Sequence, residues 1–397
     1  MKLSNRPADR FDWTLAFILL LFCIVSALAI SSAQTSGQYG INFVPKQIVW
    51  YGVGAFIIAG AMYFEPEQYK KVSWYVYGFG IFLLLLLHFA PEGVGQLGEK
   101  HANVKRWLHF PEPIGRIQPS EFFKVFFILG MARLVSTHHE KSEIRSIKSD
   151  CVLLGKMALV LLVPLAFIAK QPDLGSGIVL IAITAAIVIV SGITWKIILP
   201  AVIVGGGGAG FLLFGALYAQ DFMVDKLGFK AYQFERIYSW LDPYAYRSDE
   251  GLHLIQSLTA IGSGGMTGKG YQGREVYVME NHTDFIFTII GEEYGFIGAC
   301  VVISLYFFLI YHLTKIALEI RDSYSTYVIT GVIALITFHV FENIGMTIQV
   351  MPITGIPLPL ISYGGSSIMS TMLAIGLVFS IKFHHRTFMF DSDDDDE

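Results

Sequence analysis

Residues 13–33 read WTLAFILLLFCIVSALAISSA, and this stretch decides the class of fold. It carries no charge and is long enough, as a helix, to cross the apolar core of a bilayer. Lipid offers no partner to backbone N–H and C=O groups, so each such run is expected to be helical. Comparable runs give ten predicted spans, near 13–33, 46–63, 73–90, 119–135, 152–169, 174–191, 194–219, 285–313, 326–350 and 364–383.

The composition of the whole chain supports this interpretation. Of 397 residues, 54% are hydrophobic and only 15% are charged, with a mean hydropathy of +0.55, whereas soluble domains carry about 25% charged residues. The net charge of −4 comes from the acidic end DSDDDDE at 391–397, and no nucleic-acid motif is present, so we expect no nucleic-acid partner. The three scattered cysteines, Cys23, Cys151 and Cys300, indicate neither a disulfide framework nor a CxxC metal site.

The predicted fold is an all-α integral membrane protein, a polytopic bundle of about ten transmembrane helices. Residues 1–390 form one transmembrane domain, with a large extracellular loop at 220–284 between helices 7 and 8, and 391–397 form a disordered acidic tail. The basic N-terminus and inner loops favour cytoplasmic termini, since Lys and Arg prefer that side. The glycine run Gly205–Gly208 predicts close helix packing in the seventh span.

The loop at 220–284 is too long to be a structureless connection, so we expect it to be partly folded or functional. Its aromatic and basic stretch 232–246 suits an amphipathic helix. Gly262-Ser-Gly-Gly-Met-Thr-Gly-Lys-Gly270 is either a flexible turn or an anion-binding loop with Lys269. Asp284 follows, at the start of the eighth span, where it either caps the helix or acts as a base. Glu292 and Glu293 lie further in and are expected to raise its pKa.

Other polar residues fall at or inside predicted spans. Glu121 and Lys124 are three apart at the start of the fourth span and can pair. Asp173 follows the outer turn Lys170-Gln-Pro and either caps the sixth span or binds substrate. His339 and Asn343, with Glu342 and Thr347, form a polar stripe of interhelical hydrogen bonds or a cavity lining, and we favour the cavity. The proline- and glycine-rich stretch 351–367, which contains Ser366, breaks the helical pattern, as is tolerated only in buried or cavity-lining backbone.

Six of these segments together resemble one family. They are Lys105-Arg-Trp-Leu108, Gln118-Pro-Ser-Glu121 with Lys124, Gln171-Pro-Asp-Leu-Gly175, Gly262–Gly270, His282-Thr-Asp-Phe-Ile-Phe287 with Gly291–Gly298, and Pro359–Ser367. In this order they resemble the polytopic cell-wall polymerases that include RodA, FtsW and SpoVE, the SEDS peptidoglycan glycosyltransferases. Asn343-Ile-Gly-Met346 with Pro352–Pro359 is similar to the RodA branch. Lys105 and Ser176 replace the usual Asn and Thr, which leaves the charged residues intact.

The resemblance implies a bacterial cytoplasmic membrane enzyme that polymerises lipid II into glycan strands on the outer face, for cell elongation and rod shape. It implies Asp284 as the catalytic residue. The residues implied to bind the substrate and its lipid-linked glycan strand are Arg106, Glu121, Lys124, Asp173, Lys269, His339, Asn343 and Ser366. A divalent cation, Mg²⁺ or Mn²⁺, is a candidate because pyrophosphate binds one readily. No dedicated metal site is visible and no organic cofactor is expected.

The resemblance also implies a partner, a transpeptidase of the class B penicillin-binding type within the elongation machinery. Two other functions are compatible with a polar, multi-span bundle. One is a flippase or transporter of the lipid-linked precursor, since broken helices occur in transporters. The other is a membrane scaffold for a transpeptidase without activity of its own.

Overall fold

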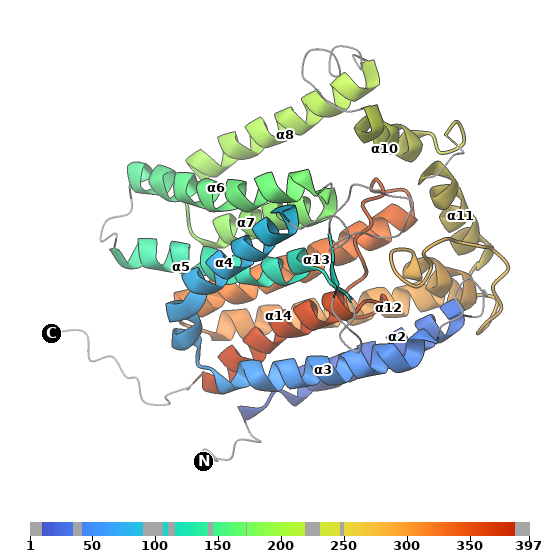
Figure 1. The fold of residues 1–397 in the computed structure, drawn as a ribbon, viewed down its shortest axis with the longest axis horizontal. Coiled ribbons are helices and arrows are strands. Elements are labelled where there is room, and N and C mark those ends of the chain that lie inside the picture. The colour runs from blue at the N-terminus through green and yellow to red at the C-terminus, as the bar shows by residue number, and fades with distance from the viewer. Residues whose placement is uncertain are drawn as a thin grey trace.

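The computed structural model describes residues 10–34, 42–89, 106–109, 116–141, 146–171, 173–218, 231–246 and 250–385. Long helices lie side by side in one bundle (Figure 1). The described elements are α2 (Trp13–Ala33), α3 (Phe43–Tyr63), α4 (Pro66–Phe89), β1 (Leu108–His109), β2 (Arg116–Ile117), α5 (Pro119–Lys141), α6 (Ile147–Lys170), α7 (Leu174–Val190), α8 (Trp195–Tyr218), α10 (Ala231–Leu241), α11 (Glu250–Ser263), α12 (Ile286–Glu319), α13 (Ser323–Thr347) and α14 (Gly365–His384).

Each predicted span coincides with one long helix, so the all-α membrane bundle is confirmed. Within the described ranges, seven helices are long and apolar enough to cross a membrane: α2, α3, α4, α6, α12, α13 and α14. Shorter apolar stretches occupy 175–190 in α7 and 195–208 in α8. Helix α5 is less apolar because it contains Glu121, Lys124 and Arg133.

Polar side chains cap the starts of several of the long helices. Asp12 accepts a hydrogen bond from Leu15 N at 2.9 Å and begins α2. Asp322 does the same for α13 through Ser325 N, also at 2.9 Å. These caps satisfy backbone donors that have no partner within the first turn of a helix.

The centre of the bundle consists of α5, α13 and α14. Helix α14 packs along α3, and α13 packs against α5, α7 and α12. Peripheral helices carry exposed apolar side chains, as a lipid-facing surface requires; Val204 on α8 is 74% exposed. A Cβ added at any of Gly205–Gly208 would meet nothing within 4 Å. The predicted close packing of this glycine run is therefore wrong for the described chain, because the run lies on the outer helix and lacks a facing neighbour there.

The long segment before α12 is folded in its described part. It contains α10 and α11, which lie beyond one end of the bundle (Figure 1). A short antiparallel pair, β1 with β2, matches Leu108 to Ile117 and His109 to Arg116. The acidic tail 391–397 lies outside the described residues.

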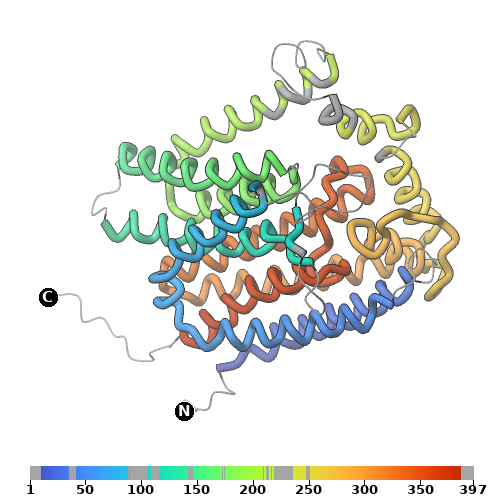
Figure 2. The backbone as a smooth tube through the Cα atoms, in the orientation of Figure 1, coloured from blue at the N-terminus to red at the C-terminus, as the bar shows by residue number. Residues whose placement is uncertain are grey.

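The described ends of the chain lie at the other end of the bundle. The start of α2 and the end of α14 are close together (Figure 2). Arg10 and His385 line one cavity of about 890 Å³, together with side chains from the α3–α4 junction, α5 and α13. The two ends of the bundle thus differ, with the folded loop segment at one and both described chain ends at the other.

Candidate active site

Asp284 lies in a turn, residues 280–285, that is fixed to the irregular stretch before α14. Ser362 Oγ donates to the carbonyl of Thr283 at 2.6 Å, and Tyr363 N donates to the carbonyl of His282 at 2.8 Å. These bonds join two segments about 80 residues apart in sequence. The turn that contains Asp284 is therefore held by the stretch before α14, in addition to its covalent link to α12.

Asn343 of α13 completes this fixation. Its Nδ2 donates to the carbonyl of Asp284 at 2.7 Å and to that of Ile356 at 2.8 Å. One buried amide therefore connects the turn, the irregular stretch and α13. At Asn343, the polar stripe of α13 therefore forms hydrogen bonds to other elements of the bundle. Asn343 orients the backbone of Asp284, and its Nδ2 is already occupied.

The side chain of Asp284 does not cap α12. The residue at the cap is Phe285, and the helix start has no side-chain cap hydrogen bond. Gly355 lies directly against the carboxylate, since a Cβ built on it would be 3.2 Å from Asp284 Oδ2. Gly355 has φ +73°, a conformation that favours glycine. The capping interpretation is wrong, and the carboxylate is left available for another role.

The pKa of Asp284 is raised to about 7, chiefly by burial and then by the negative charge of Glu280, while Arg106 lowers it. Glu292 and Glu293 were expected to raise this pKa, but the carboxylate that adds to the effect of burial is Glu280. A carboxyl group with a pKa near neutrality is suited to accept a proton at physiological pH. Arg106 Nε also donates to the carbonyl of Gln171 at 3.0 Å, so the turn after α6 positions this cation.

Glu292 is instead compensated by the glycine-rich segment. Lys269 Nζ lies 2.8 Å from Glu292 Oε1 and 3.0 Å from Glu275 Oε2. The hydrogen bond from Lys269 to Glu292 is the main cause that raises the lysine pKa. The backbone N–H groups of Glu275 and Val276 donate to the same Glu292 oxygen. Lys269 is thus engaged in holding the segment to α12, and pyrophosphate binding by it stays a prediction.

The backbone of α12 is interrupted at Gly295, which has φ 62° and ψ −158°. The segment fills the interruption with four hydrogen bonds. The N–H groups of Lys269 and Gly270 donate to the carbonyls of 292 and 293, and those of 296 and 297 donate to Gly265 and Met266. The glycine run is therefore a fixed part of the helix, and its predicted role as a flexible turn is wrong.

A buried polar chain crosses the centre of the bundle. Lys124 Nζ donates to Glu121 Oε1 at 2.7 Å and lies 3.0 Å from His339 Nε2. His339 Nδ1 lies 2.9 Å from the carbonyl of Leu335, which accepts its proton and leaves Nε2 as the acceptor from Lys124. The predicted pairing of Glu121 with Lys124 is confirmed. Since the Lys124 side chain is only 3% exposed, phosphate binding by it requires one of these partners to move.

Asp173 and Ser366 belong to a neighbouring cluster. Asp173 Oδ1 caps α7 by accepting from Ser176 N at 3.2 Å, and Oδ2 accepts from Ser120 Oγ at 3.3 Å. Ser366 Oγ accepts from Gln118 N at 3.0 Å. The starts of α5, α7 and α14 therefore meet, which brings together three of the sequence segments that are far apart along the chain. Direct contact of Asp173 and Ser366 with substrate stays a prediction.

Glu280 and Gly355 were not expected from the sequence to act at this site. Glu280 precedes Asp284 by four residues within one polar segment, so its charge could have been considered from the sequence. Gly355 is 71 positions away and only the fold places it against the carboxylate. The divalent cation has no cluster of three His, Cys, Asp or Glu side chains to hold it in the part of the chain described. The divalent cation therefore stays a prediction, and no step of the proposed reaction depends on a metal.

Comparison with known proteins covers nearly the whole chain. The sequence profile of the FtsW/RodA/SpoVE family, described as "Cell cycle protein", matches residues 9–387. The chain is 32% identical to the peptidoglycan glycosyltransferase MrdB of Escherichia coli K12 over 95% of both chains. It is 31% identical to the stage V sporulation protein E of Bacillus subtilis 168, over 94% of this chain and 98% of that protein.

Solved structures are similar over the same length. A chain from a structure entitled "Structural coordination of polymerization and crosslinking by a peptidoglycan synthase complex" has a TM-score of 0.72 and 26% identity, covering 94% of this chain and 97% of that one. The rod shape determining protein RodA of Thermus thermophilus has a TM-score of 0.65 at 24% identity, covering 94% and 96%. The latter supports the fold alone.

Proposed function

The chain belongs to the FtsW/RodA/SpoVE family, and from that premise we propose that Asp284 is the general base of a lipid II polymerase. The enzyme is a peptidoglycan glycosyltransferase, in agreement with the names of its relatives. The observation that carries the catalytic assignment is the carboxyl group of Asp284. It is fixed at its backbone, does not cap α12, and has a pKa raised to about 7.

The proposed reaction is a direct displacement with inversion. The 4-hydroxyl of the GlcNAc in lipid II attacks the anomeric carbon of the growing strand, which is α-linked to undecaprenyl pyrophosphate. The new β-1,4 C–O bond forms as the bond to pyrophosphate breaks, and the hydroxyl proton passes to Asp284. The leaving pyrophosphate keeps the electron pair and needs positive charge nearby. Arg106 is the proposed cation, since its charge already acts at the Asp284 carboxyl.

The test uses purified protein and labelled lipid II. Asp284→Asn keeps the shape of the side chain and removes the basic group, so polymerisation should fall by about 10²–10⁴-fold. Glu280→Gln is the matched control, because it removes a carboxylate from the same turn and leaves the base in place. If Asp284→Asn polymerises at the native rate, the assignment is wrong. Arg106→Ala should also lose polymerisation while it remains folded, and full activity would exclude Arg106 as the pyrophosphate cation.

The same assay separates the two other functions. A flippase would translocate lipid II across vesicles without forming polymer, and a scaffold would do neither. The similarity to known proteins favours the enzyme, since a relative named as a peptidoglycan glycosyltransferase matches 95% of the chain. The role in elongation and rod shape is proposed from the similarity of 343–346 and 352–359 to the RodA branch. Deletion in a rod-shaped host should then give rounded cells, and filaments would indicate a division role.

The proposed orientation places both termini in the cytoplasm and the 280–285 turn outside. It rests on the basic N-terminus and on the two distinct ends of the bundle. In a cysteine-free background, Tyr277→Cys should react with an impermeant thiol reagent added from outside. Lys148→Cys, exposed at the other end, should not react. The reverse pattern would place the active site on the wrong side of the membrane for polymerisation.

The proposed partner is a transpeptidase of the class B penicillin-binding type. Support comes from the solved relative whose title joins polymerisation to crosslinking in one complex. Mild detergent extraction followed by pull-down on this chain should recover such an enzyme from native membranes. Its reproducible absence, with other bound proteins retained, would count against the partnership.

A further inference from the structure

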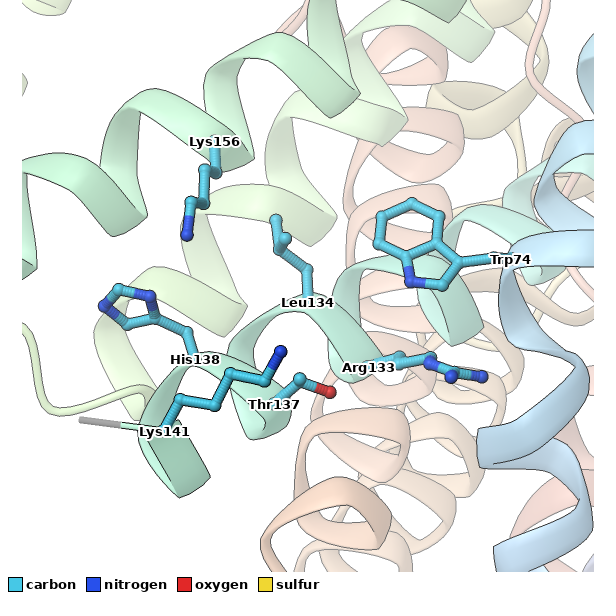
Figure 3. A pocket seen from close by; sticks show the side chains of 7 residues that line it. All are labelled: Trp74, Arg133, Leu134, Thr137, His138, Lys141 and Lys156. Atoms are coloured by element: carbon cyan, nitrogen blue, oxygen red, sulfur yellow. The ribbon is translucent and has the colours of Figure 1, made fainter. Parts of the chain in front are cut away.

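A second site lies at the end of the bundle that holds the described chain ends. It is a cavity of about 290 Å³ between α4, α5 and α6 (Figure 3). It shares Arg133 and Thr137 with the larger cavity that Arg10 and His385 line. The site lies near Lys141, the last residue of α5, whereas the cluster near the active site lies at the first residues of α5. Its other main lining residues are Trp74, Leu134, His138 and Lys156.

The described lining of the cavity is positively charged and contains no balancing carboxylate. Arg133, Lys141 and Lys156 line it, and no Asp or Glu does. Lys141 and Lys156 make no hydrogen bond or ion pair within the described ranges. Arg133 Nη1 donates to the backbone carbonyls of Lys70 and Lys71, which are uncharged acceptors. An unbalanced cluster of three cations favours an anionic ligand.

The neighbouring carboxylates are already engaged. Glu140, beside Lys141 in sequence, is paired with Lys70 on the side of the larger cavity. Asp150, near the start of α6, accepts hydrogen bonds from the backbone N–H and the hydroxyl of Thr194, at 3.0 and 2.7 Å. Neither one neutralises the cavity, so within the described residues its charge is left for a bound anion.

The position of Lys156 indicates that the ligand comes from the membrane and not from the aqueous solution. It lies within α6, a helix apolar enough to span the membrane, and the neighbouring Leu159 is 65% exposed and Val152 53% exposed. A lysine in such a surface directs its ammonium toward a polar group while its stem covers apolar surface. In Figure 3 its side chain extends from α6 toward His138 and Leu134 of α5. The cation is therefore presented at a lipid-facing surface and toward the cavity.

We propose that this cavity binds the phosphate of an anionic glycerophospholipid. The phosphate lies among Arg133, Lys141 and Lys156, and the acyl chains lie against the exposed apolar side chains of α6. Trp74 lines the same cavity, as is common for aromatic residues at the headgroup level of a membrane. Basic pockets between membrane helices are suited to anionic headgroups. A soluble anion could satisfy the cations but would leave the apolar surface beside them uncovered.

The experiment measures binding of phosphatidylglycerol to the full-length protein in zwitterionic nanodiscs, with phosphatidylcholine as the comparison lipid. Each lysine should contribute about five-fold to the affinity, and Lys141→Gln with Lys156→Gln together should weaken binding by about 30-fold. The matched control is Lys148→Gln with Lys196→Gln, which removes the same charge from exposed positions on α6 and α8 outside the cavity. The control should bind phosphatidylglycerol as the native protein does.

Two outcomes overturn the proposal. Equal weakening in the cavity and control variants would show a general surface charge effect. Competition by glycerol phosphate at the same concentration as the lipid would show a small-anion site. Each lysine is also changed singly, with folding monitored by gel filtration. A folded single variant that keeps full affinity excludes that lysine, and two such variants exclude the site.

Discussion

The ion pair between Glu121 and Lys124 allows a quantitative test of how the centre of the bundle is held together. The two charged atoms are 2.7 Å apart, and their side chains are only 8% and 3% exposed. Removal of one partner from a buried pair leaves an uncompensated charge and costs about 3–5 kcal/mol. Lys124→Met and Glu121→Gln should each lower the free energy of unfolding by about that amount.

The double variant should be less destabilised than the sum of the two single variants. With neither charge present, the main remaining loss is the donor to His339 Nε2, worth about 1–3 kcal/mol for a buried acceptor. The coupling energy should therefore be about 3 kcal/mol or more, at the upper end of the range for residues in contact. Unfolding is measured in one detergent at fixed lipid content. Ser370→Ala is a control, since it removes the 3.4 Å contact to Glu121 Oε2 and a bond to the Ser367 carbonyl at 3.1 Å but leaves both charges in place.

Two results would refute this reasoning. Additive losses would show that the charges do not stabilise each other, and a stable Lys124→Met variant would show that Glu121 is not left uncompensated. Polymerisation of lipid II by the double variant separates structure from substrate binding. Activity that returns with stability indicates a structural pair. A stable but inactive double variant indicates that Glu121 or Lys124 also acts on the substrate.

Three further predictions follow from the active site and α12. Polymerisation should rise with pH and reach half its maximum near pH 7, the pKa of Asp284. Glu280→Gln should move this midpoint to lower pH, because it removes a negative charge that raises the pKa of Asp284. A pH–rate profile of the native protein and the variant tests both expectations. The pKa of Asp284 in the folded protein lies above its ordinary value of 3.8, so its contribution to stability is present below about pH 4 and is lost as pH rises through 7. Asp284→Asn should remove this pH dependence when the melting temperature is measured at a series of pH values. An unchanged slope of melting temperature against pH would contradict the expectation. Gly295→Ala should destabilise by about 1–3 kcal/mol from its backbone conformation alone, with a further clash of its Cβ 2.5 Å from the N of the facing segment, whereas Gly262→Ala, which meets nothing within 4 Å, should melt as the native protein does.

The spans could be predicted from sequence because each apolar run must satisfy its backbone internally once it enters lipid. The pairing of Glu121 with Lys124 was predicted for a similar reason, since a spacing of three fixes proximity on any helix. Even Asp173 as a helix cap followed from local chain geometry. These features depend on short separations, and the chemistry of a helix is sufficient to predict them.

The remaining features depend on contacts between distant segments. The partner of Lys124 across the bundle is His339, 215 residues later. Glu292 was expected to act on Asp284, but Lys269, 23 residues earlier, neutralises it. The glycines at 205–208 were interpreted as packing residues, although periodicity does not show which helix faces a neighbour. Asp284 could therefore be singled out from the sequence, and its catalytic role is a proposal, but the charged neighbours expected for it were wrong.

The interruption of α12 at Gly295 has a consequence for protein engineering. Two carbonyls and two N–H groups that the helix leaves unpaired are all satisfied by residues 265–270. A chimera that exchanges the segment before α12 with a relative about 30% identical would place foreign backbone into this interruption. The segment 262–270 and the helix residues 291–298 must then be exchanged as one block. A crossover point placed between them would separate the two halves of a single structural unit.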